Sequence, residues 1–129
     1  MKLNSNPCPC GSNKKYSDCC ARYLESNKPA PSAEALMRSR YTAYMQLAED
    51  YLLATWHPST RPAALGLAED VPAKWIGLEV KRHEQQDADH VVEFVARYKV
   101  NGRAHRLHEV SRFVREAGRW FYVDGDILG

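Results

Sequence analysis

The stretch VEFVARYKVNGRAHRLHEVSR, residues 92–112, decides the fold of this 129-residue chain. Apolar side chains occupy every second position from Val92 to Val100, which is the period of a strand with one buried side. The dipeptide Asn101-Gly102 is typical of a two-residue hairpin turn, so a second strand is expected from Arg103 to about Arg115. The stretch therefore predicts a long antiparallel hairpin.

Counting outward from the turn fixes the register of this hairpin. Tyr98 is expected opposite His105, and Phe94 opposite Glu109. The apolar side of the first strand thereby places two polar side chains, His105 and Glu109, on the core-facing side of the second. Because a buried carboxylate is costly unless it is paired or protonated, Glu109 needs a partner.

The rest of the chain supplies further strands and two helices. Alternation at Ile76, Leu78 and Val80 predicts a strand before the hairpin, connected to it by a turn near residues 87–89, and residues 119–124 predict a strand after it. A helix is expected from Ala33 to about Glu49, with Ser32 as its N-cap and an apolar face that includes Leu47. A shorter helix is expected from Tyr51 to Trp56, capped by Asp50 and ended by Pro58. Helices followed by an antiparallel meander predict an α+β fold, with the helices on one face of a curved sheet.

Arg40 falls inside the apolar face of the first helix. A guanidinium does not lose its proton in a protein, so a buried Arg40 needs an anion or water. We expect it to meet Glu109 across the helix–sheet interface, with Tyr44, Tyr98 and His105 nearby; alternatively its aliphatic stem carries the charge out to solvent. Such a pair would be a structural ion pair or part of a polar-lined pocket for a polar or anionic small molecule. His57, where the second helix ends, either borders this cavity or caps the helix.

The cysteines form the most specific cluster in the sequence. All four of them lie in CPCGSNKKYSDCC, residues 8–20. In a reducing compartment such clustering favours a metal over disulfides, and four thiolates close a tetrahedral zinc site with no position left for water. The alternatives are a redox-active pair of thiols or reduced thiols without a metal. We expect a structural Zn²⁺, held by Cys8, Cys10, Cys19 and Cys20, that folds this otherwise coreless segment. The adjacent residues Cys19 and Cys20 can both reach the metal if they open a short helix. Two nearby lysines, Lys14 and Lys15, either compensate the thiolate charge or form a docking surface.

This cysteine segment resembles the SEC-C zinc motif, named for its place at the C-terminus of the SecA preprotein translocase, where a related motif binds zinc and contacts the chaperone SecB. The resemblance implies zinc binding and a protein partner. The last ligand differs, because Cys20 stands where the translocase motif has histidine.

Four further segments resemble the YchJ family. They are LMRSRYTAY (36–44), YLLATWHP (51–58), SRF (111–113) and WFYVDG (120–125). The resemblance implies a SEC-C motif over residues 1–24 and a nuclear-transport-factor-2-like (NTF2-like) domain over 32–129, which is a cone of helices and curved sheet around a cavity. The polar stretch with two prolines over residues 25–31 is typical of a linker between them.

Composition excludes several other classes of protein. Apolar residues make up 44% of the chain without forming a run of the roughly 20 that a membrane helix needs. No secretory leader is evident, so a cytoplasmic protein is expected. A formal net charge of +2 gives little support to nucleic-acid binding.

Two functions remain in competition. The first is a non-enzymatic zinc-containing adaptor that docks through the SEC-C motif. The second is a small-molecule-binding protein or small enzyme that uses the cavity, with Glu109 or His105 as general base and Tyr44 or Tyr98 as hydrogen-bond donor.

Overall fold

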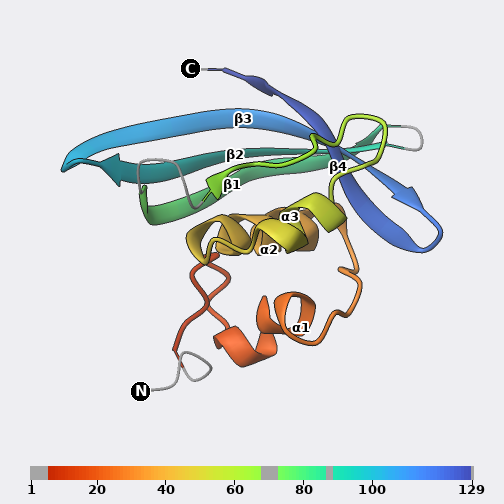
Figure 1. Ribbon diagram of the computed structural model, residues 1–129, viewed down its shortest axis with the longest axis horizontal. Helices are drawn as coiled ribbons and strands as arrows, with labels where there is room; N and C mark the ends of the chain where they lie inside the picture. The colour runs from red at the N-terminus through yellow and green to blue at the C-terminus, as the bar shows by residue number, and fades with distance from the viewer. Residues whose placement is uncertain (1–5, 68–72, 87–88, 129) are drawn as a thin grey trace.

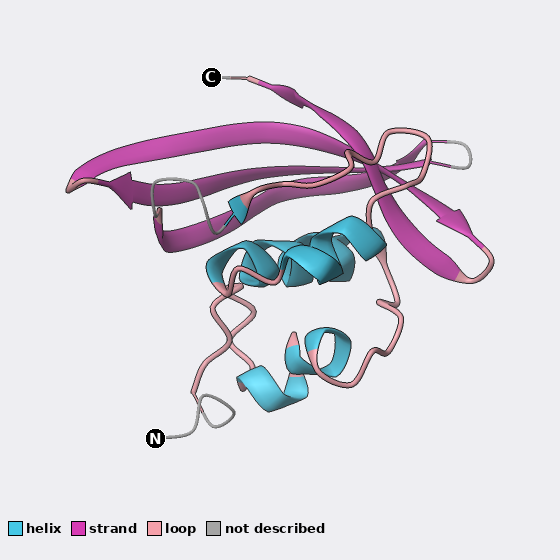
Figure 2. Cartoon of the chain, viewed as in Figure 1, coloured by secondary structure: helices cyan, strands magenta, loops and turns pink. Residues whose placement is uncertain are grey.

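The computed structural model describes residues 6–67, 73–86 and 89–128 and contains one four-stranded sheet with helices on one of its faces (Figures 1 and 2). The strands follow the order β1-β2-β3-β4 and are all antiparallel to their neighbours. Their bounds are Lys74–Gln86 (β1), Asp89–Val100 (β2), Arg103–Glu116 (β3) and Arg119–Ile127 (β4). The helical elements are Tyr16–Asp18 (η2, a 3-10 turn), Ala21–Leu24 (α1), Ala33–Met45 (α2) and Glu49–Ala54 (α3). The expected α+β architecture is confirmed.

The central hairpin has the predicted register. Tyr98 lies opposite His105, and Phe94 lies opposite Glu109. Asn101 and Gly102 both adopt a positive φ, 51° and 78°, which a two-residue turn matched to the twist of the strands requires. The turn expected between the first two strands falls on residues 87–88, which lie outside the described residues.

Strand β1 differs from its prediction at one position. Trp75 pairs with Tyr98 and Gly77 pairs with Arg97, so Ile76 is an extra residue in a β-bulge. Its side chain is 47% exposed, whereas Trp75 packs against the core. The prediction that Ile76 shares the core face of Leu78 and Val80 is therefore wrong, because the bulge changes the phase of the alternation.

Helix α2 is shorter than predicted, whereas α3 has the predicted length but lies two residues earlier in the chain. Ser32 caps α2 as expected, its hydroxyl accepting from the Ala35 amide at 3.1 Å. The helix ends at Met45 rather than near Glu49, because Leu47 takes a positive φ of 57° and its side chain is 58% exposed instead of joining the apolar face. Helix α3 starts after Ala48, so Asp50 lies in its first turn and is not its cap.

The main core lies between α2 and the sheet. Leu36, Met37 and Tyr41 of α2 pack against Val92, Phe94 and Phe113 of β2 and β3. A second, smaller core contains the four cysteines and Tyr16, on the side of α2 away from the sheet (Figure 1). Helix α2 is thus the middle layer of the molecule. None of the helices in the described ranges combines the length and the hydropathy that a membrane span demands.

Candidate functional site

The four cysteine side chains converge on one point. The Sγ atoms of Cys8, Cys10, Cys19 and Cys20 all lie within 4.8 Å of one another, and all four residues are buried. The Sγ atoms of Cys10 and Cys19 are 3.5 Å apart. Tetrahedral zinc with Zn–S bonds of about 2.3 Å places its sulfurs about 3.8 Å apart, so the cluster has the dimensions that a metal with four thiolate ligands requires.

The local backbone explains how the four cysteines meet. Gly11 turns the chain directly after the first pair with a φ of 79°, and the Cys8 amide donates to the Lys14 carbonyl at 2.8 Å across the resulting loop. A 3-10 turn then leads to the second pair. Cys20 is the N-cap of α1, which agrees with the expectation that the adjacent ligands open a short helix.

The proton chemistry of the cluster also fits a cation. A hydrogen bond from Cys10, with a second from Cys20, lowers the pKa of the Cys8 thiol to about 3. Hydrogen bonds to Cys10 and Cys8, together with burial, raise the pKa of Cys20. Four buried thiols this close cannot all ionise without a positive charge among them, and a bound divalent metal would supply that charge.

A ladder of polar side chains on α2 and its C-cap residue holds the cysteine segment in place. Arg38 Nη1 donates to the Cys10 carbonyl at 2.7 Å, Thr42 Oγ1 donates to Cys20 Sγ at 3.4 Å, and Gln46 Nε2 donates to the Tyr16 hydroxyl at 3.1 Å. These three donors follow one another at intervals of four residues and therefore lie along one side of the helix. Sequence reasoning missed the ladder, although its spacing was visible.

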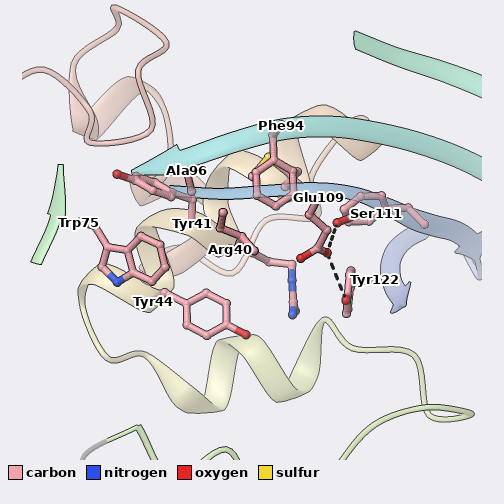
Figure 3. A pocket seen from close by; sticks show the side chains of 12 residues that line it. Arg40, Tyr41, Tyr44, Trp75, Phe94, Ala96, Glu109, Ser111 and Tyr122 are labelled. Atoms are coloured by element: carbon pink, nitrogen blue, oxygen red, sulfur yellow. Dashed lines mark hydrogen bonds between the residues drawn. The ribbon is translucent and has the colours of Figure 1, made fainter. Parts of the chain in front are cut away.

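A pocket of about 280 Å³ lies on the opposite side of α2, between the helix and the sheet (Figure 3). Most of its wall is aromatic or aliphatic, and its polar groups include Arg40, Tyr44, Glu109, Ser111 and Tyr122. Burial raises the pKa of Tyr122 and of Tyr44, so both hydroxyls keep their protons and can donate.

Arg40 lies where predicted but has different partners. Its side chain is 6% exposed, yet the predicted ion pair with Glu109 is wrong. Nη1 donates instead to the Leu52 carbonyl at 2.8 Å and to Thr55 Oγ1 at 2.7 Å, at the C-terminal end of α3, where backbone carbonyls carry partial negative charge. The guanidinium also lies 4.6 Å from the ring centre of Tyr122. Burial lowers the pKa of Arg40, and these partners compensate for its lost hydration.

Glu109 is held at the sheet side of the pocket by its own neighbours. Its Oε2 accepts from the Ser111 hydroxyl at 2.6 Å and from the Tyr122 hydroxyl at 3.5 Å. Gly125 on β4 pairs with Ser111, and a Cβ at Gly125 would overlap the carboxylate. A glycine inside a strand signals such a close approach, and sequence reasoning overlooked it.

The other three cavity candidates lie outside this pocket. His105 is exposed and stacks on Tyr98, with ring centres 5.3 Å apart. His57 Nε2 contacts Glu116 Oε2 at 2.8 Å, and its Nδ1 contacts Ser59 Oγ at 2.7 Å. The structure thus brings Arg40, Tyr44 and Glu109 together and leaves the two histidines and Tyr98 apart from them.

Comparison with known proteins gives two family matches. Residues 32–125 match the model described as the YchJ middle NTF2-like domain, and residues 5–22 match the SEC-C motif. A UPF0225 protein of Chromobacterium violaceum is 63% identical over 123 residues, covering 92% of this chain and 90% of the relative. A UPF0225 protein of Cupriavidus pinatubonensis is 58% identical over 135 residues, covering 99% of this chain and 93% of the relative.

Two solved structures share the fold. The solution structure of a SEC-C motif containing protein from Rhodopseudomonas palustris is 34% identical, with a TM-score of 0.86 over 96% of this chain and 100% of the other. The crystal structure of a SEC-C motif containing protein from Psychrobacter arcticus is 26% identical, with a TM-score of 0.81 over 100% of this chain and 86% of the other. The two relatives described above bear the name UPF0225. The expected combination of motif and NTF2-like domain is confirmed, and the chain belongs to the YchJ family.

Proposed function

We propose that this protein is a non-enzymatic, cytoplasmic binding protein whose SEC-C segment is folded around a structural Zn²⁺ and serves as a docking element. The observation that carries the proposal is the cluster of four buried Sγ atoms within 4.8 Å. Four thiolates fill the coordination sphere of zinc, so no position is left for a substrate or an activated water. The metal would supply folding energy rather than chemistry.

The docking role is supported by the charge that the segment presents. Lys14 and Lys15 are exposed on the loop between the two cysteine pairs, while the cysteines are buried beneath them. A partner with an acidic surface fits this arrangement.

Metal content tests the first half of the proposal. We expect about one zinc per chain in freshly purified, reduced protein by elemental analysis, and a large loss of zinc in Cys20→Ser. Ser17→Ala, an exposed change inside the same motif, is the matched control and should retain its metal. Metal-free wild-type protein would refute the zinc site.

A charge reversal tests the docking half. Lys14→Glu with Lys15→Glu should abolish capture of the partner in affinity purification while leaving the zinc content unchanged. Lys99→Glu with Arg103→Glu makes the same change of charge at the exposed tip of the β2–β3 hairpin and should preserve capture. Equal loss of partner capture in both variants would contradict docking through the SEC-C segment.

The second candidate function is the binding of a small molecule between α2 and the sheet. This function is favoured by the pocket of about 280 Å³, which is lined by the buried Arg40 and by Glu109. Glu109 accepts hydrogen bonds from Ser111 and Tyr122, which hold it in place as an acceptor. A group held in this way can bind a ligand without taking part in a reaction.

A further inference from the structure

The pocket between α2 and the sheet contains two opposite charges that do not contact each other. Arg40 enters from α2 and Glu109 from β3, and both line the same space (Figure 3). Each has its own anchor, the end of α3 for Arg40 and Ser111 for Glu109. Anchoring keeps the charges apart and leaves part of each group facing the pocket.

Arg40 retains donors for a ligand. Its Nη1 is used by Leu52 and Thr55, and the Tyr44 hydroxyl contacts the guanidinium as well. A guanidinium has five N–H groups, so even with these contacts about two N–H groups remain without an acceptor among the described residues. The Arg40 side of the pocket therefore calls for an acceptor on the ligand.

Glu109 retains an acceptor. Both of its hydrogen bonds, from Ser111 and from Tyr122, end on Oε2. The second oxygen, Oε1, accepts from no group in the described part of the chain, and a carboxylate oxygen in a largely apolar wall is poorly hydrated. The Glu109 side therefore calls for a donor on the ligand.

The sum of the two charges decides the charge of the ligand. An anion attracted by Arg40 is repelled by Glu109, and a cation attracted by Glu109 is repelled by Arg40. An uncharged group that accepts on one edge and donates on the other satisfies both residues. A carboxamide, with its carbonyl and N–H groups in one plane, is the simplest such group.

The remaining wall suits a flat ring. Trp75, Phe94 and Phe113 contribute aromatic faces and edges. A volume of 280 Å³ holds about nine waters at liquid density, which is comparable to the roughly nine non-hydrogen atoms of benzamide.

We propose that this pocket binds an uncharged aromatic carboxamide, whose carbonyl accepts from Arg40 and whose N–H group donates to Glu109. The inference rests on the second candidate function given above and specifies its ligand class.

A matched series of probes tests the charge argument directly. Benzamide, benzoate and benzamidine share one ring and differ in the charge of the attached group, and NMR titration of ¹⁵N-labelled full-length protein can follow the Trp75 indole signal. We expect benzamide to bind about tenfold more tightly than either charged analogue. Tighter or equal binding of benzoate or benzamidine would overturn the ligand class while leaving a binding pocket in place. Absence of binding by all three probes would overturn both the ligand class and the pocket function.

A charge-neutralising variant provides the second arm. Glu109→Gln keeps an oxygen for Ser111 but removes the negative charge, so benzoate should gain about tenfold relative to wild type. Glu116→Gln makes the same change on β3 outside the pocket and should leave the order of the three probes unaltered. Unchanged benzoate binding in folded Glu109→Gln would refute the role given to Glu109. If that variant does not fold, the wild-type series still decides between the ligand classes.

Discussion

Replacing Gly125 with alanine should destabilise the protein, although alanine ordinarily favours folding by restricting the unfolded chain. Gly125 lies in β4 beside Ser111, and the Glu109 carboxylate packs directly over it. A methyl group at this position would overlap Glu109 Oε2 and stand 2.9 Å from Cδ. The glutamate side chain must therefore rotate away from the strand.

The size of the effect follows from the contacts that the rotation breaks. The hydrogen bond from Ser111 to Glu109, 2.6 Å long, ends on a charged group, and such bonds contribute about 1.5–3 kcal/mol. The entropic benefit of alanine over glycine offsets about 0.4–1 kcal/mol. The net cost is about 1–2 kcal/mol, which lowers the Tm by about 4–8 °C.

Thermal and urea denaturation of four variants measure this prediction: Gly125→Ala, Gly77→Ala, Glu109→Ala and the double variant Glu109→Ala with Gly125→Ala. Gly77→Ala in β1 is the control, because a Cβ there meets no atom within 4 Å, and its stability should change by less than about 0.5 kcal/mol. In a Glu109→Ala background the cost of Gly125→Ala should disappear. The same cost in both backgrounds would refute the reasoning, since the methyl group would then be meeting something other than the carboxylate.

Three further predictions concern α2 and its neighbours. Thr42→Val removes the hydroxyl that donates to Cys20 and should weaken zinc about tenfold in a chelator competition without changing the zinc-to-protein ratio; unchanged affinity would contradict a supporting role. Arg40→Lys cannot reproduce the two hydrogen bonds of Nη1 and should lower the free energy of unfolding in urea by about 2–3 kcal/mol; a neutral result would show that the buried charge is satisfied in another way. Burial raises the pKa of Tyr51 from 10.0 to about 12. The part of the unfolding free energy that comes from its protonated hydroxyl is therefore present below pH 10 and is lost as the pH rises toward 12. The difference in unfolding free energy between wild type and Tyr51→Phe should therefore shrink by roughly 2 kcal/mol over that range, and a constant difference would argue against the shifted pKa.

The sequence predicts the sheet correctly where residues adjacent in the chain fix its structure. Asn101-Gly102 sets the hairpin register because its turn geometry and the two-residue period of a strand leave a single alignment. The bulge at Ile76 interrupts the two-residue period of β1, and the types of the adjacent residues do not predict it. The end of α2 was also mispredicted, because Leu47 adopts a left-handed backbone conformation that its residue type does not favour.

The candidate sites also combine features that the local sequence predicts with features that depend on tertiary packing. The spacing of the cysteines alone identifies four side chains whose Sγ atoms the fold brings within 4.8 Å of one another. The helical period places Arg40 correctly inside the apolar face, but its partners depend on tertiary packing. Sequence reasoning looked for a carboxylate because opposite charges are visible in a sequence, whereas the carbonyl of Leu52 at the end of α3 is a backbone group that any residue would provide.

Helix α2 connects the two candidate sites through its opposite sides. At 3.6 residues per turn, Thr42 and Tyr44 point about 160° apart, and the first contacts the cysteine cluster while the second lines the pocket. The helix is only 13 residues long, and each side is fixed by hydrogen bonds rather than by apolar contact alone, since Arg38 donates to the Cys10 carbonyl and Arg40 to the Leu52 carbonyl. A rigid helix anchored on both sides cannot shift toward the cysteines without moving the pocket wall. The SEC-C segment is therefore part of the scaffold that positions Arg40, and its removal would alter the pocket.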